Sequence, residues 1–109
     1  MTGWQKLLKQ SITQADQLEG LPGVDLAKAA AVTRVYPMRI NPYYFQLLRR
    51  AGAPLWRQAV PDPRELSDTV GIPDPLDEEN LSPVPNLVHK YPDRVLFLIS
   101  SQCAMYCRF

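Results

Sequence analysis

Apolar side chains recur at helical spacing over the first half of the chain. Trp4 and Leu8 are four residues apart behind a capping pattern, which predicts a helix over about residues 3–11. Residues 26–32 are rich in alanine and follow Asp25, whose carboxylate can cap the first turn of a helix. The sequence therefore begins with two predicted helices, joined by a stretch that contains a further short helical turn.

A third helical pattern starts with Asn41 and Pro42. An asparagine cap followed by proline is typical of a helix start, because the backbone donor that proline lacks would be unpaired there. Residues 43–50 are amphipathic, and Gly52 ends the pattern. Asp62 and the proline after it repeat this start, which predicts one more short helix.

The pattern changes in the second half of the chain. Eight of the 11 prolines lie between Pro54 and Pro92, and proline lacks the backbone donor that helices and central strands need. Residues 95–100 are then continuously apolar, as in a strand buried on both faces of a parallel sheet. We therefore expect a mainly α N-terminal region (1–70), an extended proline-rich arm (71–94), and a strand with a cysteine-bearing loop (95–109).

Charge and composition exclude several classes of function. The net charge is +1, with 12 basic and 11 acidic residues, so no broad field favours nucleic acid or an anionic membrane. No segment approaches the roughly 20 apolar residues of a membrane span, and the first residues lack a leader pattern. Two cysteines do not make a disulfide framework. We therefore expect a cytoplasmic protein that binds neither nucleic acid nor membranes.

The two cysteines are the strongest candidates for chemistry. Cys103 and Cys107 lie four residues apart just after the apolar run, and iron-sulfur clusters are held by closely spaced thiolates on such loops. By spacing alone, two such cysteines are more often unrelated buried thiols, a redox pair or half of a zinc site. The acidic side chains of residues 74–79 lack the spacing of metal ligands, so we interpret them as a solvated loop.

Two proline-containing motifs and the apolar run follow one another in a distinctive order. They are Ser82-Pro-Val-Pro85, His89-Lys-Tyr-Pro-Asp-Arg94 and the strand 95–100. Their order and spacing resemble the segment before the cluster cysteines in the lysine 2,3-aminomutase family of radical S-adenosylmethionine (radical SAM) enzymes. The resemblance runs from about Tyr36 to Phe109 and includes residues 41–48.

This resemblance implies cofactors and site residues. Cys103 and Cys107 would be two of the three cysteine ligands of a [4Fe-4S] cluster that binds S-adenosyl-L-methionine. Phe109 stands at the aromatic position that contacts the adenine, or else it only packs the loop. Tyr91 and Arg94 would help to hold pyridoxal 5′-phosphate, the alternative being a solvated basic turn before a strand. The family's fold implies that residues 95–100 are the first strand of a partial (β/α) barrel, which makes the complete protein α/β.

The resemblance also implies a reaction. Family enzymes move the α-amino group of lysine to the β carbon, and a sister branch makes β-lysine for modification of elongation factor P. The expected partner is lysine or a lysine-like amino acid, with a homo-oligomer as the assembly. The third cluster cysteine would follow Phe109, so we expect the 109-residue chain to be an inactive N-terminal fragment, and we assign no catalytic residue in it.

Two other interpretations of the chain stay open. It could be a non-catalytic helical interaction module or the remnant of a gene. A stable, cooperatively melting product would favour the interaction module. It could also be a small zinc or thiol redox protein, although two thiols and one distant histidine make a closed four-ligand zinc site difficult to build.

Overall fold

The structure, a computed structural model, describes residues 3–108. These residues form two compact units. The first unit combines residues 3–67 with residues 103–108, and the second consists of residues 68–102. The sequence divides at other points, because it groups the cysteines with the strand before them, whereas the structure places residues 103–108 with the helices.

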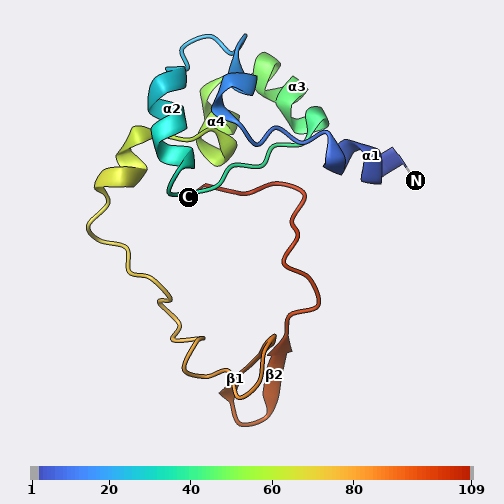
Figure 1. Ribbon diagram of the computed structural model, residues 1–109, viewed down its shortest axis with the longest axis vertical. Coiled ribbons are helices and arrows are strands. Elements are labelled where there is room, and N and C mark those ends of the chain that lie inside the picture. Colours follow the sequence, from blue (N-terminus) through green and yellow to red (C-terminus); the bar gives the residue numbers. More distant parts are fainter. Residues whose placement is uncertain (1–2, 109) are drawn as a thin grey trace. The chain divides into compact units, whose positions relative to one another are not determined.

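The first unit is helical, as the N-terminal half of the sequence predicts. Its elements, in chain order, are α1 (Gly3–Lys9), the 3-10 helix η1 (Ala15–Leu18), α2 (Leu26–Thr33), α3 (Pro42–Ala51), α4 (Ala53–Ala59) and the 3-10 helix η2 (Pro63–Ser67) (Figure 1). We refer to this unit as the helical unit.

The predicted helix starts at α2 and α3 are confirmed. The Asp25 carboxylate accepts a hydrogen bond from the backbone N–H of Lys28, at 3.1 Å. The Asn41 side-chain oxygen accepts one from the N–H of Tyr44, at 2.9 Å, and Pro42 occupies the first turn of α3. Both side chains satisfy backbone donors that the start of a helix leaves unpaired, which explains why the helices begin there.

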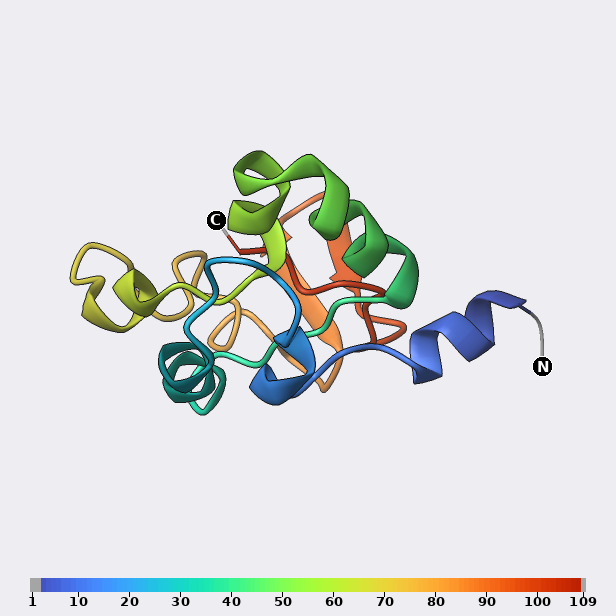
Figure 2. The ribbon, with the colours of Figure 1, turned by 90° about the horizontal axis from the view of Figure 1, so that it is seen from above.

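One helix was not predicted. Gly52 ends α3 with a φ of 71°, and the same glycine is the N-cap of α4. Pro54 lies in the first turn of α4, where its missing donor costs no hydrogen bond. The chain therefore turns at one residue and continues as a second helix, and α3 and α4 lie next to each other (Figure 2).

The core of the helical unit lies between these elements. Its largest fully buried side chains are Leu18, Val32, Ile40 and Leu48. A short bridge joins Ile12 to Ile40, whose backbone groups exchange hydrogen bonds of 2.7 and 3.0 Å. This bridge brings the segment after α1 against the segment before α3.

The first helix contributes nothing to this core. No residue of α1 is buried, and Trp4 and Leu7 are 65% and 41% exposed. The ribbon extends away from the other helices in both views (Figures 1 and 2). Among the described residues, the helical part that packs therefore begins after α1.

The second unit contains a small sheet. Strand β1 (Leu87–Tyr91) pairs antiparallel with β2 (Arg94–Phe97) across a two-residue turn, and the pairing is irregular between Val88 and Tyr91. Residues 68–86 contain no helix, in agreement with the predicted irregular arm, whereas the end of that arm forms β1.

The strand at the end of the arm differs from the prediction. It spans residues 94–97 rather than 95–100, and its partner is the antiparallel β1 rather than a parallel strand. Its side chains are exposed, with Phe97 at 66% and the following Ile99 at 85%. The physical reason is that β1 is the one strand paired with it within the described residues, and the side chains of the apolar run stay exposed. The barrel stays a prediction.

No helix in the described part of the chain is long and apolar enough to cross a membrane.

Candidate functional site

Residues 103–108, which we call the cysteine segment, run along the helical unit. The backbone N–H of Tyr106 donates a hydrogen bond to the carbonyl of Arg39, at 3.0 Å. Two residues later, the N–H of Arg108 donates to the carbonyl of Gln58, at 2.7 Å. Alternate amides of the segment therefore point toward the helical unit, as they do in a strand at the edge of a sheet.

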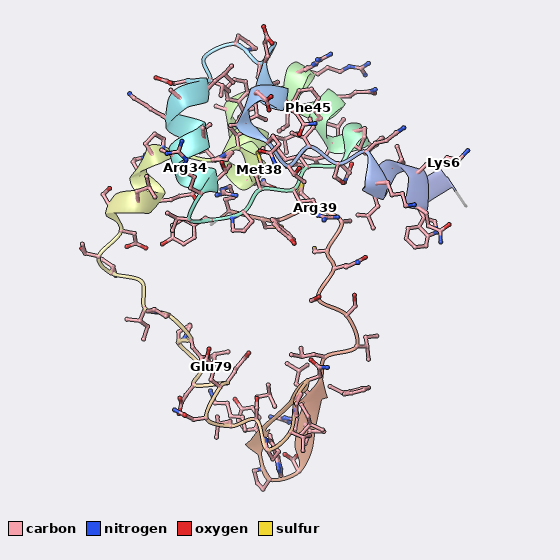
Figure 3. The ribbon with its side chains drawn as sticks, viewed as in Figure 1. Lys6, Arg34, Met38, Arg39, Phe45 and Glu79 are labelled. Atoms are coloured by element: carbon pink, nitrogen blue, oxygen red, sulfur yellow. The ribbon has the colours of Figure 1, made fainter. Side chains whose placement is uncertain are left out.

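From Tyr106 to Arg108 the side chains alternate in the same way. Tyr106 is half-buried, and the guanidinium carbon of Arg39 lies 5.7 Å from the centre of its ring. Figure 3 shows Arg39 in the stretch after α2 along which the segment runs, beside the buried Met38. Because successive side chains of an extended chain point in opposite directions, Cys107 faces away from the helical unit.

Both cysteines are free and exposed. The Cys103 thiol donates to the carbonyl of Met105, at 3.1 Å, and Met105 packs against the core. Thiols that reach solvent from an anchored backbone can become thiolate ligands, whereas buried thiols are inert. Within the described residues, the two thiols are therefore exposed rather than buried.

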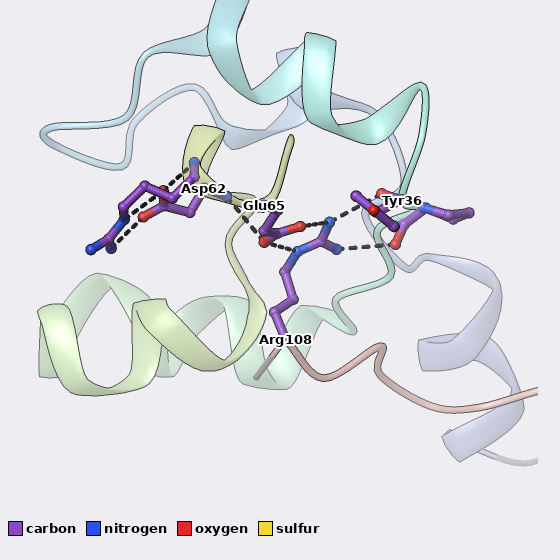
Figure 4. A network of polar contacts seen from close by, with 6 residues as sticks. Tyr36, Asp62, Glu65 and Arg108 are labelled. Carbon is purple, nitrogen blue, oxygen red and sulfur yellow. Dashed lines mark hydrogen bonds and ion pairs between the residues drawn. The ribbon is translucent and has the colours of Figure 1, made fainter. Parts of the chain in front are cut away.

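Arg108 follows Cys107 and points into the helical unit. Its guanidinium forms a bidentate ion pair with the Glu65 carboxylate, with Nε to Oε1 and Nη2 to Oε2 each at 2.8 Å (Figure 4). The same group donates to the backbone carbonyls of Pro37, at 3.0 Å, and Tyr36, at 3.1 Å. The Arg108 side chain is only 7% exposed. We call these four residues the arginine clamp.

No local pattern in the sequence indicates this clamp. Glu65 and Arg108 are 43 residues apart, and the two carbonyls are 71 and 72 residues from the arginine. Neither residue belongs to a local motif whose chemistry demands a partner. Only the fold brings them together.

The hairpin of the second unit brings Tyr91 and Arg94 together. They face each other across the ladder, and the Arg94 guanidinium carbon lies 4.5 Å from the centre of the Tyr91 ring. Lys90 places its ammonium 5.9 Å from the same ring. Arg94 is 67% exposed, and its 3.9 Å approach to Asp93 is too long for a hydrogen bond. A stacked, exposed guanidinium of this kind can donate to a phosphate in bidentate fashion.

The chemistry of these groups fits the cofactors that the sequence suggests. Two outward thiols on one anchored segment suit two ligands of an iron-sulfur cluster. The described residues contain no group of three or more His, Cys, Asp or Glu side chains placed to hold a metal ion. Phe109, the predicted adenine contact, lies outside the described residues.

The acidic loop binds its own backbone. Both oxygens of Asp74 accept hydrogen bonds, from the N–H groups of Glu78 and Glu79 at 2.8 and 2.9 Å. Asp77 accepts one from the Asn80 amide, at 2.7 Å. These side chains are exposed or half-buried, which confirms the interpretation of this stretch as a solvated loop.

Beside the clamp, Asp62 carries a strongly shifted pKa. Hydrogen bonds from the side chain and then the backbone of Arg64 lower the pKa of Asp62 from 3.8 to about 2. A carboxyl whose pKa is lower in the folded state stabilises the fold above its unfolded pKa, and this contribution disappears as the pH falls from about 4 to about 2.

Replacing Arg64 by glutamine is expected to raise the pKa of Asp62 toward its ordinary value. The largest cause of the shift is the side-chain hydrogen bond from Arg64, so most of the effect should disappear with it. Carboxyl-carbon NMR across the acid range measures both values directly. An Asp62 that titrates near 3.8 in the unaltered protein would show that the pair does not persist in solution.

The described residues define a helical unit that presents two exposed thiols four positions apart. No protein-family model matches the chain. It is 46% identical over 80 residues to an L-lysine 2,3-aminomutase from Bacillus subtilis, a match that covers 71% of this chain and 17% of the relative. It is 40% identical over 114 aligned positions to the L-lysine 2,3-aminomutase of Methanococcus maripaludis, covering 96% of this chain and 26% of the relative.

A third relative agrees with these two. The L-lysine 2,3-aminomutase of Fusobacterium nucleatum is 37% identical over 111 aligned positions, covering 96% of this chain and 26% of the relative. The chain belongs to the lysine 2,3-aminomutase family. It spans between 17% and 26% of the length of these three relatives.

Proposed function

We propose that this chain is part of a radical SAM aminomutase that moves the α-amino group of L-lysine to the β carbon. The observation that carries the proposal is the alignment of 96% of the chain with an L-lysine 2,3-aminomutase at 40% identity. The proposed substrate is lysine or a closely similar amino acid. Use of the product to modify elongation factor P is a finer part of the same proposal.

In this proposal, Cys103 and Cys107 are two of the cluster ligands, and Phe109 contacts the adenine of S-adenosyl-L-methionine. When bound, the [4Fe-4S] cluster supplies the electron that cleaves S-adenosyl-L-methionine and so begins the radical chemistry. The chain's own contribution is to hold the thiols outward on a backbone fixed by hydrogen bonds of 2.7 and 3.0 Å. A fixed backbone keeps the ligand spacing ready before the metal arrives.

Tyr91 and Arg94 hold pyridoxal 5′-phosphate in the same proposal. The guanidinium is delocalised and planar, so it can donate two parallel hydrogen bonds to one phosphate. The Tyr91 ring, 4.5 Å from the guanidinium carbon, limits the directions in which that group can turn. Lys90 adds positive charge near the same ring without a bidentate fork.

Replacing Arg94 by glutamine is expected to weaken binding of pyridoxal 5′-phosphate by about 10- to 100-fold, because a charge-assisted hydrogen bond contributes about 1.5–3 kcal/mol. The affinity of the Arg94→Lys variant should lie between those of the unaltered protein and the glutamine variant, since lysine keeps the charge and loses the bidentate fork. Titration of the cofactor, followed by its absorbance, measures the affinity. Arg50→Gln, an exposed arginine in the last turn of α3, is the matched control. Equal losses in both variants would point to net charge alone.

The proposed function is tested on the longer protein that carries this chain and spans the length of the relatives, which we call the full-length protein. It is reconstituted anaerobically with iron and sulfide and supplied with both organic cofactors. We expect β-lysine to form from L-lysine only when S-adenosyl-L-methionine and pyridoxal 5′-phosphate are both present. Transfer of the product to elongation factor P is assayed beside it.

Two results would contradict the proposal. A cluster-loaded protein that cleaves S-adenosyl-L-methionine but leaves lysine unchanged would show that lysine is not the substrate, while the proposed radical chemistry would stand. A protein that takes up no iron under these conditions would contradict both the substrate and the radical chemistry.

A further inference from the structure

The arginine clamp joins the residue after Cys107 to two separate parts of the helical unit, η2 and the stretch after α2. We propose that Arg108 and Glu65 are positioning residues that hold Cys107 in place for metal binding. This inference rests on the proposed function, because it assigns these two residues to the assembly of the same cluster. It concerns residues that contact neither the metal nor the substrate.

The geometry of the clamp leaves little freedom to the guanidinium. Its hydrogen bonds to Glu65 and to the carbonyls of Tyr36 and Pro37 use four of the five N–H donors that an arginine carries. The pair is partly buried, with the arginine side chain 7% and the carboxylate side chain 25% exposed. A buried cation with its donors paired is stable, whereas removal of one partner leaves an uncompensated charge.

A neighbouring ion pair shows what distinguishes the clamp. Arg64 and Asp62 lie at 2.7 Å, which is as short as the contacts of the clamp, but their side chains are 80% and 40% exposed. They are only two residues apart, so their pairing constrains no distant part of the chain. Exposed pairs of this kind contribute little to stability. The Arg64 pair is therefore a matched control for the Arg108 pair.

The clamp acts on Cys107 through the backbone. The Arg108 side chain is fixed by Glu65, and the backbone N–H of Arg108 donates to the carbonyl of Gln58. The backbone N–H of Tyr106 donates to the carbonyl of Arg39. Cys107 therefore lies between two anchored residues while its own side chain stays exposed. A ligand that is already ordered loses less conformational entropy when it binds, which raises affinity without adding a contact to the metal.

The first measurement is amide hydrogen exchange at Tyr106 and Arg108 in the 109-residue chain. Glu65→Gln and Arg108→Lys are expected to lower the protection of both amides at least tenfold, because the first removes the charge and the second removes the fork. Arg64→Gln should leave both amides unchanged. Urea unfolding followed by Trp56 fluorescence checks that the helical unit is still folded. Unchanged protection in both clamp variants would overturn the proposal.

The second measurement is the iron content of the full-length protein after reconstitution and desalting, together with the electron paramagnetic resonance spectrum of the reduced cluster. We expect Glu65→Gln and Arg108→Lys to retain at least threefold less iron and to shift the spectrum, while Arg64→Gln matches the unaltered protein. A variant that was only less stable would lose cluster without any change in the spectrum of what remains.

The outcomes separate this inference from the proposed function. If the unaltered protein holds iron and both clamp variants hold as much with the same spectrum, the positioning role is wrong and the cluster assignment stands. If the unaltered protein takes up no iron, the proposed function fails and the positioning role fails with it.

Discussion

Replacing Cys107 by serine is expected to reduce the iron retained by the full-length protein to background and to abolish any turnover that depends on a cluster. An iron-sulfur cluster needs deprotonated sulfur ligands, and a serine hydroxyl stays protonated at neutral pH. The substitution exchanges a single sulfur atom for oxygen at an exposed position, so the fold should not change. Iron and sulfide content per chain and the visible absorbance of the cluster are the measurements.

The same measurements on two further variants make this result specific. Cys103→Ser should lose the cluster equally, because both thiols are assigned as ligands. Ser101→Ala, an exposed change two residues before Cys103, should keep it. If Cys107→Ser retained as much cluster as the unaltered protein, the assignment of the cysteine segment as the metal site would be wrong.

The second large effect concerns stability. Replacing Leu48 by alanine is expected to destabilise the helical unit by about 2–5 kcal/mol, because the truncation leaves a cavity in a packed core. Leu48 lies on α3 and is only 1% exposed. A native protein has a total stability of only about 5–15 kcal/mol, so the loss is a large fraction of the whole and the urea midpoint should fall clearly. Urea unfolding followed by circular dichroism and by Trp56 fluorescence measures the change.

Leu7→Ala provides the matched control for this prediction. It removes the same atoms from a helix, but Leu7 is 41% exposed on α1, which buries none of its residues. We expect a change within about 0.5 kcal/mol there. Similar losses at the two positions would mean that α1 packs in solution against a surface that the described residues leave open.

The helix starts were predictable because their chemistry is local. Asp25 and Asn41 each bond to an amide three residues later, and this requires no contact with the rest of the chain. The pattern does not predict helix α4, because Gly52 indicates only the end of the helix before it. Pro54, close behind it, was the available signal, since proline is favoured in the first turn of a helix.

The small sheet has no comparable signal in the sequence. Residues 87–91 and 94–97 are separated by Pro92 and Asp93, and this pair lacks the glycine or asparagine that two-residue hairpin turns favour. A proline at this position indicates an irregular arm rather than a hairpin. The burial of the second strand could not be predicted at all, because it depends on which segments cover it and not on its own composition.

The candidate site also contains residues that local patterns indicate and residues that only tertiary structure brings together. The cysteine pair is visible in the sequence, since four-residue spacing after an apolar run is a local pattern. Tyr91 and Arg94 are three residues apart and also belong to a local motif, and their stacking follows from the hairpin. Glu65 and Arg108 meet only through tertiary structure, so their partnership had to come from the fold.

Because residues 68–102 form a separate unit, the cysteine segment is attached to the helices through a tether of about 35 residues. A tethered segment behaves as a ligand whose effective concentration is set by the length and stiffness of the tether. Doubling the tether would cost only about 0.6 kcal/mol. Insertions into residues 68–102 should therefore leave docking of the cysteines almost unchanged, whereas a single substitution in the clamp can release them.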